Sequence, residues 1–204
     1  MQMMDKGGPV MWVLLAYSVI ALAIVLERAI ALLRMPRMDG DVSRALATDP
    51  ETCPEAAMAH GLREAKARGV ANLERVASRI GSAQLVRMET GLRTLAWLGN
   101  TAPLLGLFGT ITGMIKAFMV IEAAGGKVDA QALAGGIWEA MITTGAGLAV
   151  AIPVLFLLHL LEGMVDRRAR SMGQVASLML EESPAAVDAT EARVHHRKSL
   201  SHAV

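Results

Sequence analysis

Two threonines, Thr110 and Thr144, lie near the middle of two long apolar stretches, where a hydroxyl is one of the few polar groups present. At about 1.5 Å per residue, Thr110 lies about 16 Å before a helix end at Ile121, and Thr144 about 14 Å after a helix start at Gly135. A ring of such helices would enclose a narrow passage with hydroxyls at one depth. Alternatively, each hydroxyl bonds the backbone carbonyl four residues earlier and only packs.

Both threonines belong to stripes of small residues. At about 100° per residue, one side of the second stretch holds Gly99, Pro103, Gly106, Thr110, Gly113 and Ala117. The third stretch has a matching side with Gly136, Ala140, Thr144, Gly147 and Ala151. Such a face either packs its backbone closely against another helix or lines a narrow space. We expect support for this close packing from Pro103, Gly106, Gly109, Gly113, Ala140, Gly147 and Pro153, where Pro153 also permits a bend.

Lys116 and Glu139 are ionisable residues inside the same two stretches, each near the outer end. Ionisable side chains are costly in hydrocarbon and are usually paired or close to water. In antiparallel neighbours the two could meet where the helices touch, so we hypothesise a salt bridge within or between subunits. The alternative is that Lys116 extends to the headgroups while Glu139 stays hydrated.

Other reactive side chains are less informative. His159 is expected to be an interfacial or packing residue rather than a proton relay. Cys53 is the single cysteine, which excludes a disulfide within the chain and a CxxC metal site, and we expect an inert, reduced thiol. His195 and His196 fall in a charged tail and are more typical of a solvated segment than of a metal pair. We expect neither a metal nor a cofactor.

Three apolar stretches position these residues. The chain is 53% hydrophobic but only 3% aromatic, more apolar than a soluble domain. Because roughly 20 apolar residues cross a bilayer, we predict transmembrane helices at 10–33, 95–121 and 133–161. The predicted fold is an all-α polytopic membrane protein with three transmembrane helices, in which spans two and three extend into the cytoplasm.

The remaining segments are predicted to be mostly polar and helical. Short amphipathic helices are expected at 41–47 and 55–68. Helical spacing of apolar residues from Val70 to Arg93 predicts one long helix running into the second span, with Gly91 the only possible interruption. The full expected order is a short N-terminus 1–9, the first span, a cytoplasmic helical segment 34–94, the second span, a loop 122–132, the third span, a cytoplasmic helix 162–182 and a disordered tail 183–204.

The basic residues predict the orientation in the membrane. Lys6 and Lys127 fall on one side and Lys116 lies within a span, while every other lysine and arginine falls on the second side. Because cytoplasmic loops carry an excess of such residues, the N-terminus and the 122–132 loop are expected to be periplasmic. The C-terminus is expected to be cytoplasmic.

Two motifs in the striped stretches resemble those of a known family. The sequence APLLGLFGT at 102–110, followed by Gly113, is similar to the second-span signature of the MotA/TolQ/ExbB proton channel family. GIWEAMITTGAGLAVAIP at 136–153 resembles its third-span signature, and a first span ending in Leu-Glu-Arg at 26–28 is similar to short ExbB-like members.

The resemblance implies a five-subunit ring around two transmembrane helices of an ExbD/TolR-type one-span partner, whose aspartate carries the proton. Thr110 and Thr144 would face the lumen near this aspartate, and Glu139 also matches a family position. It further implies a proton-channel or stator subunit of a proton-motive-force-driven motor in the bacterial inner membrane. Such a motor energises TonB-dependent transport across the outer membrane, with a TonB-like protein transmitting the force and lipid surrounding the ring.

A TolQ-like subunit for envelope integrity and a non-conducting membrane scaffold remain alternatives. An enzyme is not expected, because the chain has no Gly-x-Ser-x-Gly elbow, His-Glu-x-x-His pair or phosphate loop. No basic surface interleaved with aromatic residues suggests nucleic-acid binding. The cytoplasmic segment lacks a large torque-contact domain, which argues against a flagellar role.

Overall fold

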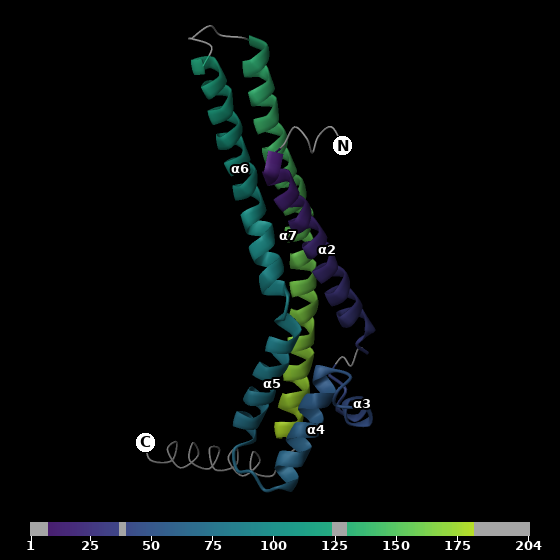
Figure 1. Ribbon diagram of the computed structural model, residues 1–204. Coiled ribbons are helices and arrows are strands. Elements are labelled where there is room, and N and C mark those ends of the chain that lie inside the picture. The colour runs from purple at the N-terminus through teal and green to yellow at the C-terminus, as the bar shows by residue number, and fades with distance from the viewer. Residues whose placement is uncertain (1–7, 37–39, 124–129, 182–204) are drawn as a thin grey trace, which may run out of the picture. The chain divides into compact units, whose positions relative to one another are not determined.

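A computed structural model describes residues 8–36, 40–123 and 130–181 (Figure 1). Throughout these ranges the regular structure is α-helical and no strand is present. Three stretches of helix are long and apolar enough to cross a membrane, Gly8–Arg34, Leu92–Ala123 and Leu133–Glu181. The chain is therefore an all-α polytopic membrane protein, which confirms the predicted fold class.

The chain divides into two compact units. The first comprises Met1–Ala31 and Thr90–Glu162, and the second Leu32–Glu89 and Gly163–Val204. The first unit contains most of α2 (Gly8–Arg34), all of α6 (Leu92–Ala123) and the first part of α7 (Ala130–Glu181). Because α7 is a single helix of 52 residues, it contributes to both units.

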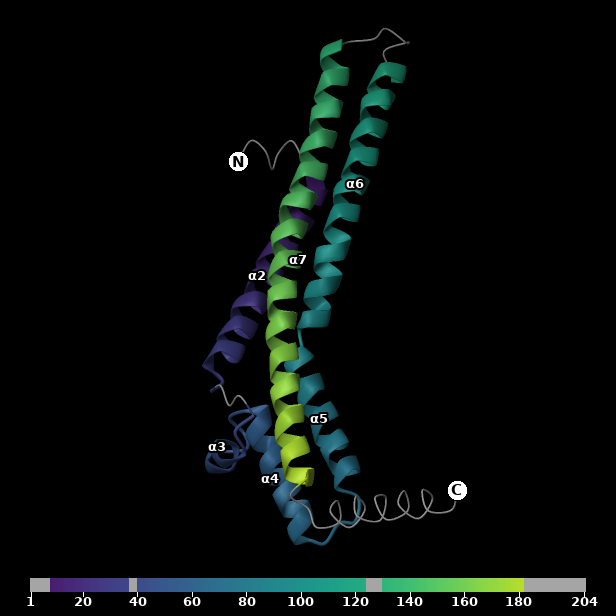
Figure 2. The ribbon, with the colours of Figure 1, turned by 180° about the vertical axis from the view of Figure 1, so that it is seen from behind.

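In the first unit, α6 and α7 lie side by side as an antiparallel pair (Figure 2). The facing sides are made of small residues, which allow the two backbones to approach closely. The buried small residues of α6 are Gly99, Ala102, Gly106, Gly109, Gly113 and Ala117. On α7, Ala140, Thr143, Gly147 and Ala151 are buried.

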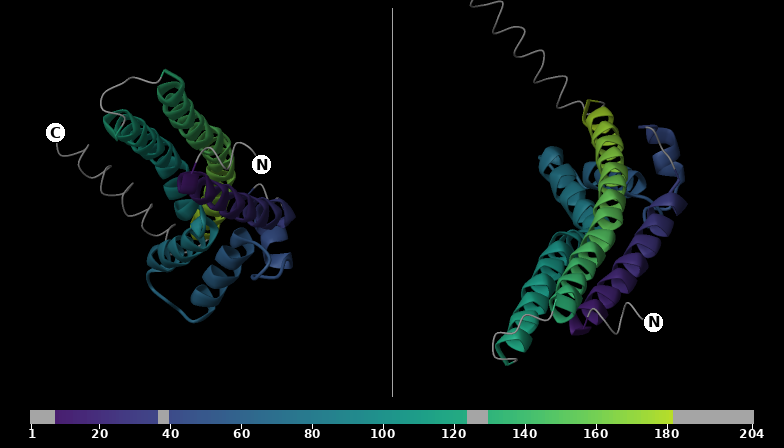
Figure 3. Two further views of the ribbon diagram at one scale, coloured as in Figure 1. Left: turned by 45° about the horizontal axis from the view of Figure 1, so that its top comes forward. Right: turned by 90° about the horizontal axis from the view of Figure 1, so that it is seen from above.

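Helix α2 packs against this pair. Its Leu14 is 2% exposed and joins Ala102 of α6 and Ala151 of α7 in one apolar cluster. Nearby, the rings of Tyr17 and Trp97 lie 6.0 Å apart between centroids. Figure 3 shows α2 and α6 on different sides of α7. The two helices therefore do not compete for the same face of α7.

The second unit is a small helical cluster around the C-terminal part of α7. Its other helices are α3 (Val42–Ala47), α4 (Pro54–Ala67) and α5 (Leu73–Glu89). Asp41 caps α3 by accepting bonds from two backbone amides, and Pro54 opens α4. The shared core is formed by Ala45, Met58, Ala59, Leu62, Ala77, Met172, Val175 and Ala176. The short helices expected at 41–47 and 55–68 are present with nearly these bounds.

The prediction of one helix running from Val70 into the second span is wrong. Helix α5 ends at Glu89, and α6 begins at Leu92. Between them Gly91 has φ +85°, a left-handed conformation that ends a helix and suits glycine. Extension of the third span is as predicted, because α7 continues to Glu181.

Several predictions concern segments outside the described residues. These are the N-terminal residues 1–7, the part of the predicted loop at 124–129 and the tail from 182 onwards.

Candidate functional site

The glycines of α6 and α7 set the register of the helix pair. A Cβ added at Gly113 would lie 3.4 Å from the Cβ of Ala140, and one added at Gly109 would lie 2.6 Å from the Cβ of Thr143. A Cβ at Gly147 would lie 2.7 Å from the carbonyl oxygen of Ala102. An added Cβ would clash at Gly109 and Gly147, whereas at Gly113 it would make ordinary van der Waals contact, so the two helices approach most closely at Gly109 and Gly147.

Thr143 occupies the centre of this contact. Its side chain is 1% exposed, and its hydroxyl donates to the carbonyl of Ala140 at 2.8 Å. The helical wheel had placed Thr144 on the small-residue face. In the structure the contact face of α7 is centred closer to Thr143, whose side chain packs on Gly109. The sequence signal for a buried Thr143 is its position one helical turn from both Ala140 and Gly147, on the side of α7 that faces Gly109.

Thr110 and Thr144 lie at one edge of the helix pair and at the same level. Each follows directly after a residue of the central contact, Gly109 in α6 and Thr143 in α7. A step of about 100° in two antiparallel right-handed helices turns both side chains toward the same side of the pair. The structure thus brings the two predicted hydroxyls to a common edge, half-buried in the single chain.

The two hydroxyls differ in their bonds. Thr110 Oγ1 donates to the carbonyl oxygen of Leu107 in its own helix at 2.6 Å. Thr144 Oγ1 donates to the carbonyl oxygen of Gly106 in the facing helix at 3.3 Å. Back-bonding of the kind weighed as an alternative therefore occurs at Thr110, three residues back rather than four, whereas Thr144 bonds across the pair.

Lys116 and Glu139 meet at the opposite edge. Lys116 Nζ lies 3.2 Å from Glu139 Oε1, with the lysine side chain 59% and the glutamate side chain 27% exposed. Each residue comes just before a buried alanine of the contact face, Ala117 or Ala140, so the same rotation argument turns both away from the threonine edge. Gly8, the first residue of α2, borders this pair, since a Cβ there would lie 3.5 Å from Glu139 Oε1.

The other predicted residues divide between contact face and surface. The central positions Gly106, Gly109, Gly113, Ala140 and Gly147 are at the helix contact. Pro103 is half-buried and Pro153 exposed, and both lie inside continuous helices. His159 is exposed, with Nδ1 2.7 Å from the carbonyl oxygen of Leu155. Among the described residues, no group of three or more His, Cys, Asp or Glu could hold a metal ion.

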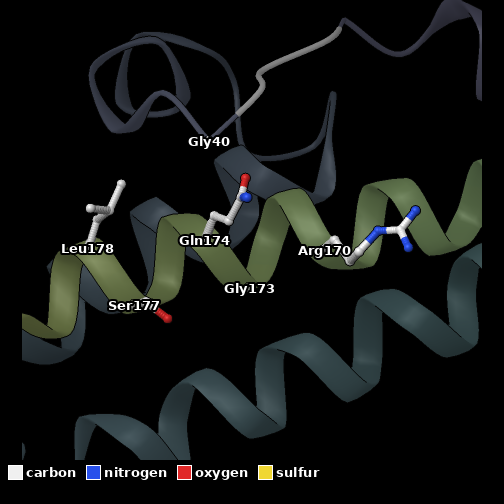
Figure 4. Close-up of a pocket in the computed structure, with 6 residues that line it drawn as sticks. All are labelled: Gly40, Arg170, Gly173, Gln174, Ser177 and Leu178. Carbon is white, nitrogen blue, oxygen red and sulfur yellow. The ribbon is translucent and has the colours of Figure 1, made fainter.

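A shallow depression of about 600 Å³ lies in the second unit (Figure 4). Its residues are Gly40, Arg170, Gly173, Gln174, Ser177 and Leu178. The side chains of Gln174, Ser177 and Leu178 leave α7 in different directions and do not converge on a common point. None of the residues predicted to carry function lines this depression.

The family model for the MotA/TolQ/ExbB proton channel family matches residues 50–174. The chain therefore belongs to this family, which confirms the resemblance seen in the two span motifs. The matched range includes α6 and the transmembrane part of α7, and with them both threonines and the Lys116–Glu139 pair.

Individual relatives of the chain carry names that are consistent with this family. The chain is 41% identical over 81 residues to "Biopolymer transport protein exbB1" of Vibrio cholerae serotype O1, covering 40% of this chain and 36% of the relative. It is 45% identical over 69 residues to "Biopolymer transport protein ExbB" of Neisseria gonorrhoeae, covering 34% and 31%. It is also 38% identical over 96 residues to "Putative biopolymer transport protein ExbB-like 1" of Synechocystis, covering 46% and 38%. The match thus spans roughly a third of each relative's length.

Proposed function

We propose that this chain is an ExbB-type channel subunit of a proton-motive-force-driven complex in the bacterial inner membrane. Family membership supports the class, and the relatives' names point to biopolymer transport. The observation that carries the proposal is the placement of Thr110 and Thr144 at the same level on one edge of the α6–α7 pair, while α2 and the Lys116–Glu139 pair take the other edge.

A passage lined by this edge requires a titrating group from another chain. Threonine hydroxyls do not ionise at neutral pH, and no carboxylate of the described residues shares the threonine edge. A one-span partner of the ExbD/TolR type, with an aspartate in its membrane helix, would supply it. Small residues beside the threonines leave space for such a helix. In this proposal five copies of the chain form the ring.

The proposed energetics follow from the membrane potential. Each proton that crosses releases about 2.3 kcal/mol per 100 mV. Several protons per mechanical step would therefore be needed to move the partner helices. A TonB-like protein would carry the resulting force toward the outer membrane. The chain itself would be no enzyme, would have its N-terminus in the periplasm and its C-terminus in the cytoplasm, and would be surrounded by lipid.

The alternatives are a TolQ-like subunit and a non-conducting scaffold. Both would retain the same helix pair, so the fold does not favour either. A scaffold differs in having no need for hydroxyls at the proposed lumen. The identity of the gene next to this one is informative, because a one-span protein with an aspartate in its apolar helix is the partner that the proposal requires.

Proton flux in vesicles tests the proposal. The chain and its one-span partner are co-reconstituted, and pH change inside the vesicles is followed after a potential is imposed. Combined Thr110→Ala and Thr144→Ala should abolish most of the flux. Thr112→Ala is the matched control, since Thr112 donates to the carbonyl of Gly109 at 3.0 Å but does not lie on the threonine edge. Unchanged flux in the double variant would show that the threonine edge does not line the passage, and an absence of flux in the unaltered complex would favour the scaffold.

A further inference from the structure

Arg168 of α7 bonds two segments that are far from it in sequence. Its Nη1 lies 2.5 Å from the carbonyl oxygen of Pro36, and its Nη2 lies 2.6 Å from that of Met35. Nη1 also lies 3.3 Å from Oε1 of Glu55. Met35 and Pro36 come directly after the last residue of α2, whereas Glu55 is in the first turn of α4. One guanidinium therefore connects three parts of the second unit.

These charges are shielded from solvent. Glu55 is 0% exposed and the side chain of Arg168 only 12% exposed. Oε2 of Glu55 is buried and has no hydrogen-bond partner among the described residues. Because a buried carboxylate is costly unless it is paired, Glu55 depends on Arg168 to remain inside. The planar fork of arginine, unlike a lysine ammonium, can serve two carbonyls and a carboxylate together.

Cys53 lies beside this cluster. The residue precedes α4 by one position, is 3% exposed and packs with Ala56. It is the single cysteine in the sequence, so a reagent that labels thiols reports on the exposure of this one residue. Because Cys53 directly precedes the turn of α4 that Arg168 holds, we expect movement of this turn away from Arg168 to expose the thiol.

We propose that Arg168 is a latch that holds the chain leaving α2 and the first turn of α4 on α7, and that opening of this latch exposes Cys53. Because of this latch, the end of α2 moves together with the cytoplasmic part of α7. This role concerns the second unit and does not depend on ion conduction.

The rate at which a maleimide labels Cys53 in the purified full chain tests the latch. Arg168→Met should increase the rate on the order of tenfold or more, because the buried carboxylate loses its partner and the segment opens locally. Arg167→Met is the matched control, since Arg167 is the exposed neighbour on the same helix, and its rate should stay within about twofold of the unaltered chain. Circular dichroism of each variant establishes that the helices are retained.

A second variant covers the case in which Arg168→Met unfolds and labels as fast as the chain in denaturant. Arg168→Lys keeps the positive charge but loses the fork, so its rate should fall between those of the unaltered chain and Arg168→Met. Addition of Glu55→Gln to Arg168→Met should lower the rate again, because the buried side chain of residue 55 then no longer carries an unpaired charge. A rate in Arg168→Met or Arg168→Lys equal to that of the unaltered chain would overturn the proposal. Labelling needs no partner protein, so this result is independent of the flux experiment.

Discussion

Thr144 donates a hydrogen bond across the helix pair to the carbonyl oxygen of Gly106, with 3.3 Å between the two oxygens. This approach is possible because Gly106 has no side chain, and a Cβ there would lie 3.1 Å from the Cα of Thr144. A hydroxyl that donates in this way still has acceptor lone pairs. In the proposed function, these lone pairs would accept a hydrogen bond from the protonated carboxyl group of the partner.

The close contact of α6 and α7 predicts opposite effects for two glycines of the same helix. Gly147→Ala should destabilise the protein by about 1–3 kcal/mol, because the new Cβ meets backbone atoms of Ala102 that cannot move aside. Gly145→Ala should be neutral or stabilising, since nothing lies within 4 Å of its Cβ position and alanine favours the helix. Thermal unfolding in detergent measures both. Equal losses of stability would show that the two helices do not pack at Gly147.

A double-mutant cycle tests the ion pair between α6 and α7. Lys116→Met and Glu139→Gln are each compared with the combination of both. The 3.2 Å separation predicts a coupling of about 0.5–1 kcal/mol, at the upper end for exposed pairs because the Glu139 side chain is only 27% exposed. Thr101→Ala combined with Glu139→Gln serves as an uncoupled reference, because the Thr101 hydroxyl donates to the carbonyl of Trp97 at 2.8 Å. Strictly additive losses for the Lys116 and Glu139 variants would mean that the two charges are not paired.

Burial raises the pKa of the Cys53 thiol above the ordinary value of 9.0, and the Glu55 carboxylate acts in the same direction against the lowering effects of the Ala56 amide and Arg168. The folded chain therefore holds this proton to a higher pH than the unfolded chain. Because stability falls with pH wherever the folded state binds more protons, the contribution of Cys53 is constant below about pH 9 and declines above it.

The measurement is the difference in unfolding free energy between the unaltered chain and Cys53→Ala from pH 7 to pH 10. We expect the difference to be constant up to about pH 8 and to shift against the unaltered chain above pH 9. The contributions of the other groups that titrate in this pH range are the same in both chains and cancel in this difference. A difference that stays flat through pH 10 would contradict a raised pKa.

The sequence was sufficient to predict the three spans and the small-residue faces, because apolar length and helical periodicity are local signals. Juxtaposition of Lys116 with Glu139 was likewise accessible, since antiparallel pairing of two marked helices fixes which residues share a level. The break at Gly91 was missed because the apolar spacing continues across it, and one glycine alone does not end a helix.

Two further features required the structure. Thr143 and Thr144 are adjacent, and a modest rotation of α7 decides which of them is buried against Gly109. Arg168 and Glu55 are 113 residues apart, and neither carries a local pattern that identifies the other as its partner. Contacts of this kind depend on how α4 and α7 pack, which no short motif records.

Cysteine cross-linking to the proposed one-span partner tests the central claim most directly. In a Cys53→Ala background, Thr110→Cys or Thr144→Cys is combined with a cysteine in place of the partner's membrane aspartate, and disulfide formation is measured after mild oxidation. Ile111→Cys is the control, because Ile111 is 52% exposed on another face of α6. The account predicts cross-links at positions 110 and 144 and none at 111. Cross-links at 111 but not at 110 or 144 would contradict it.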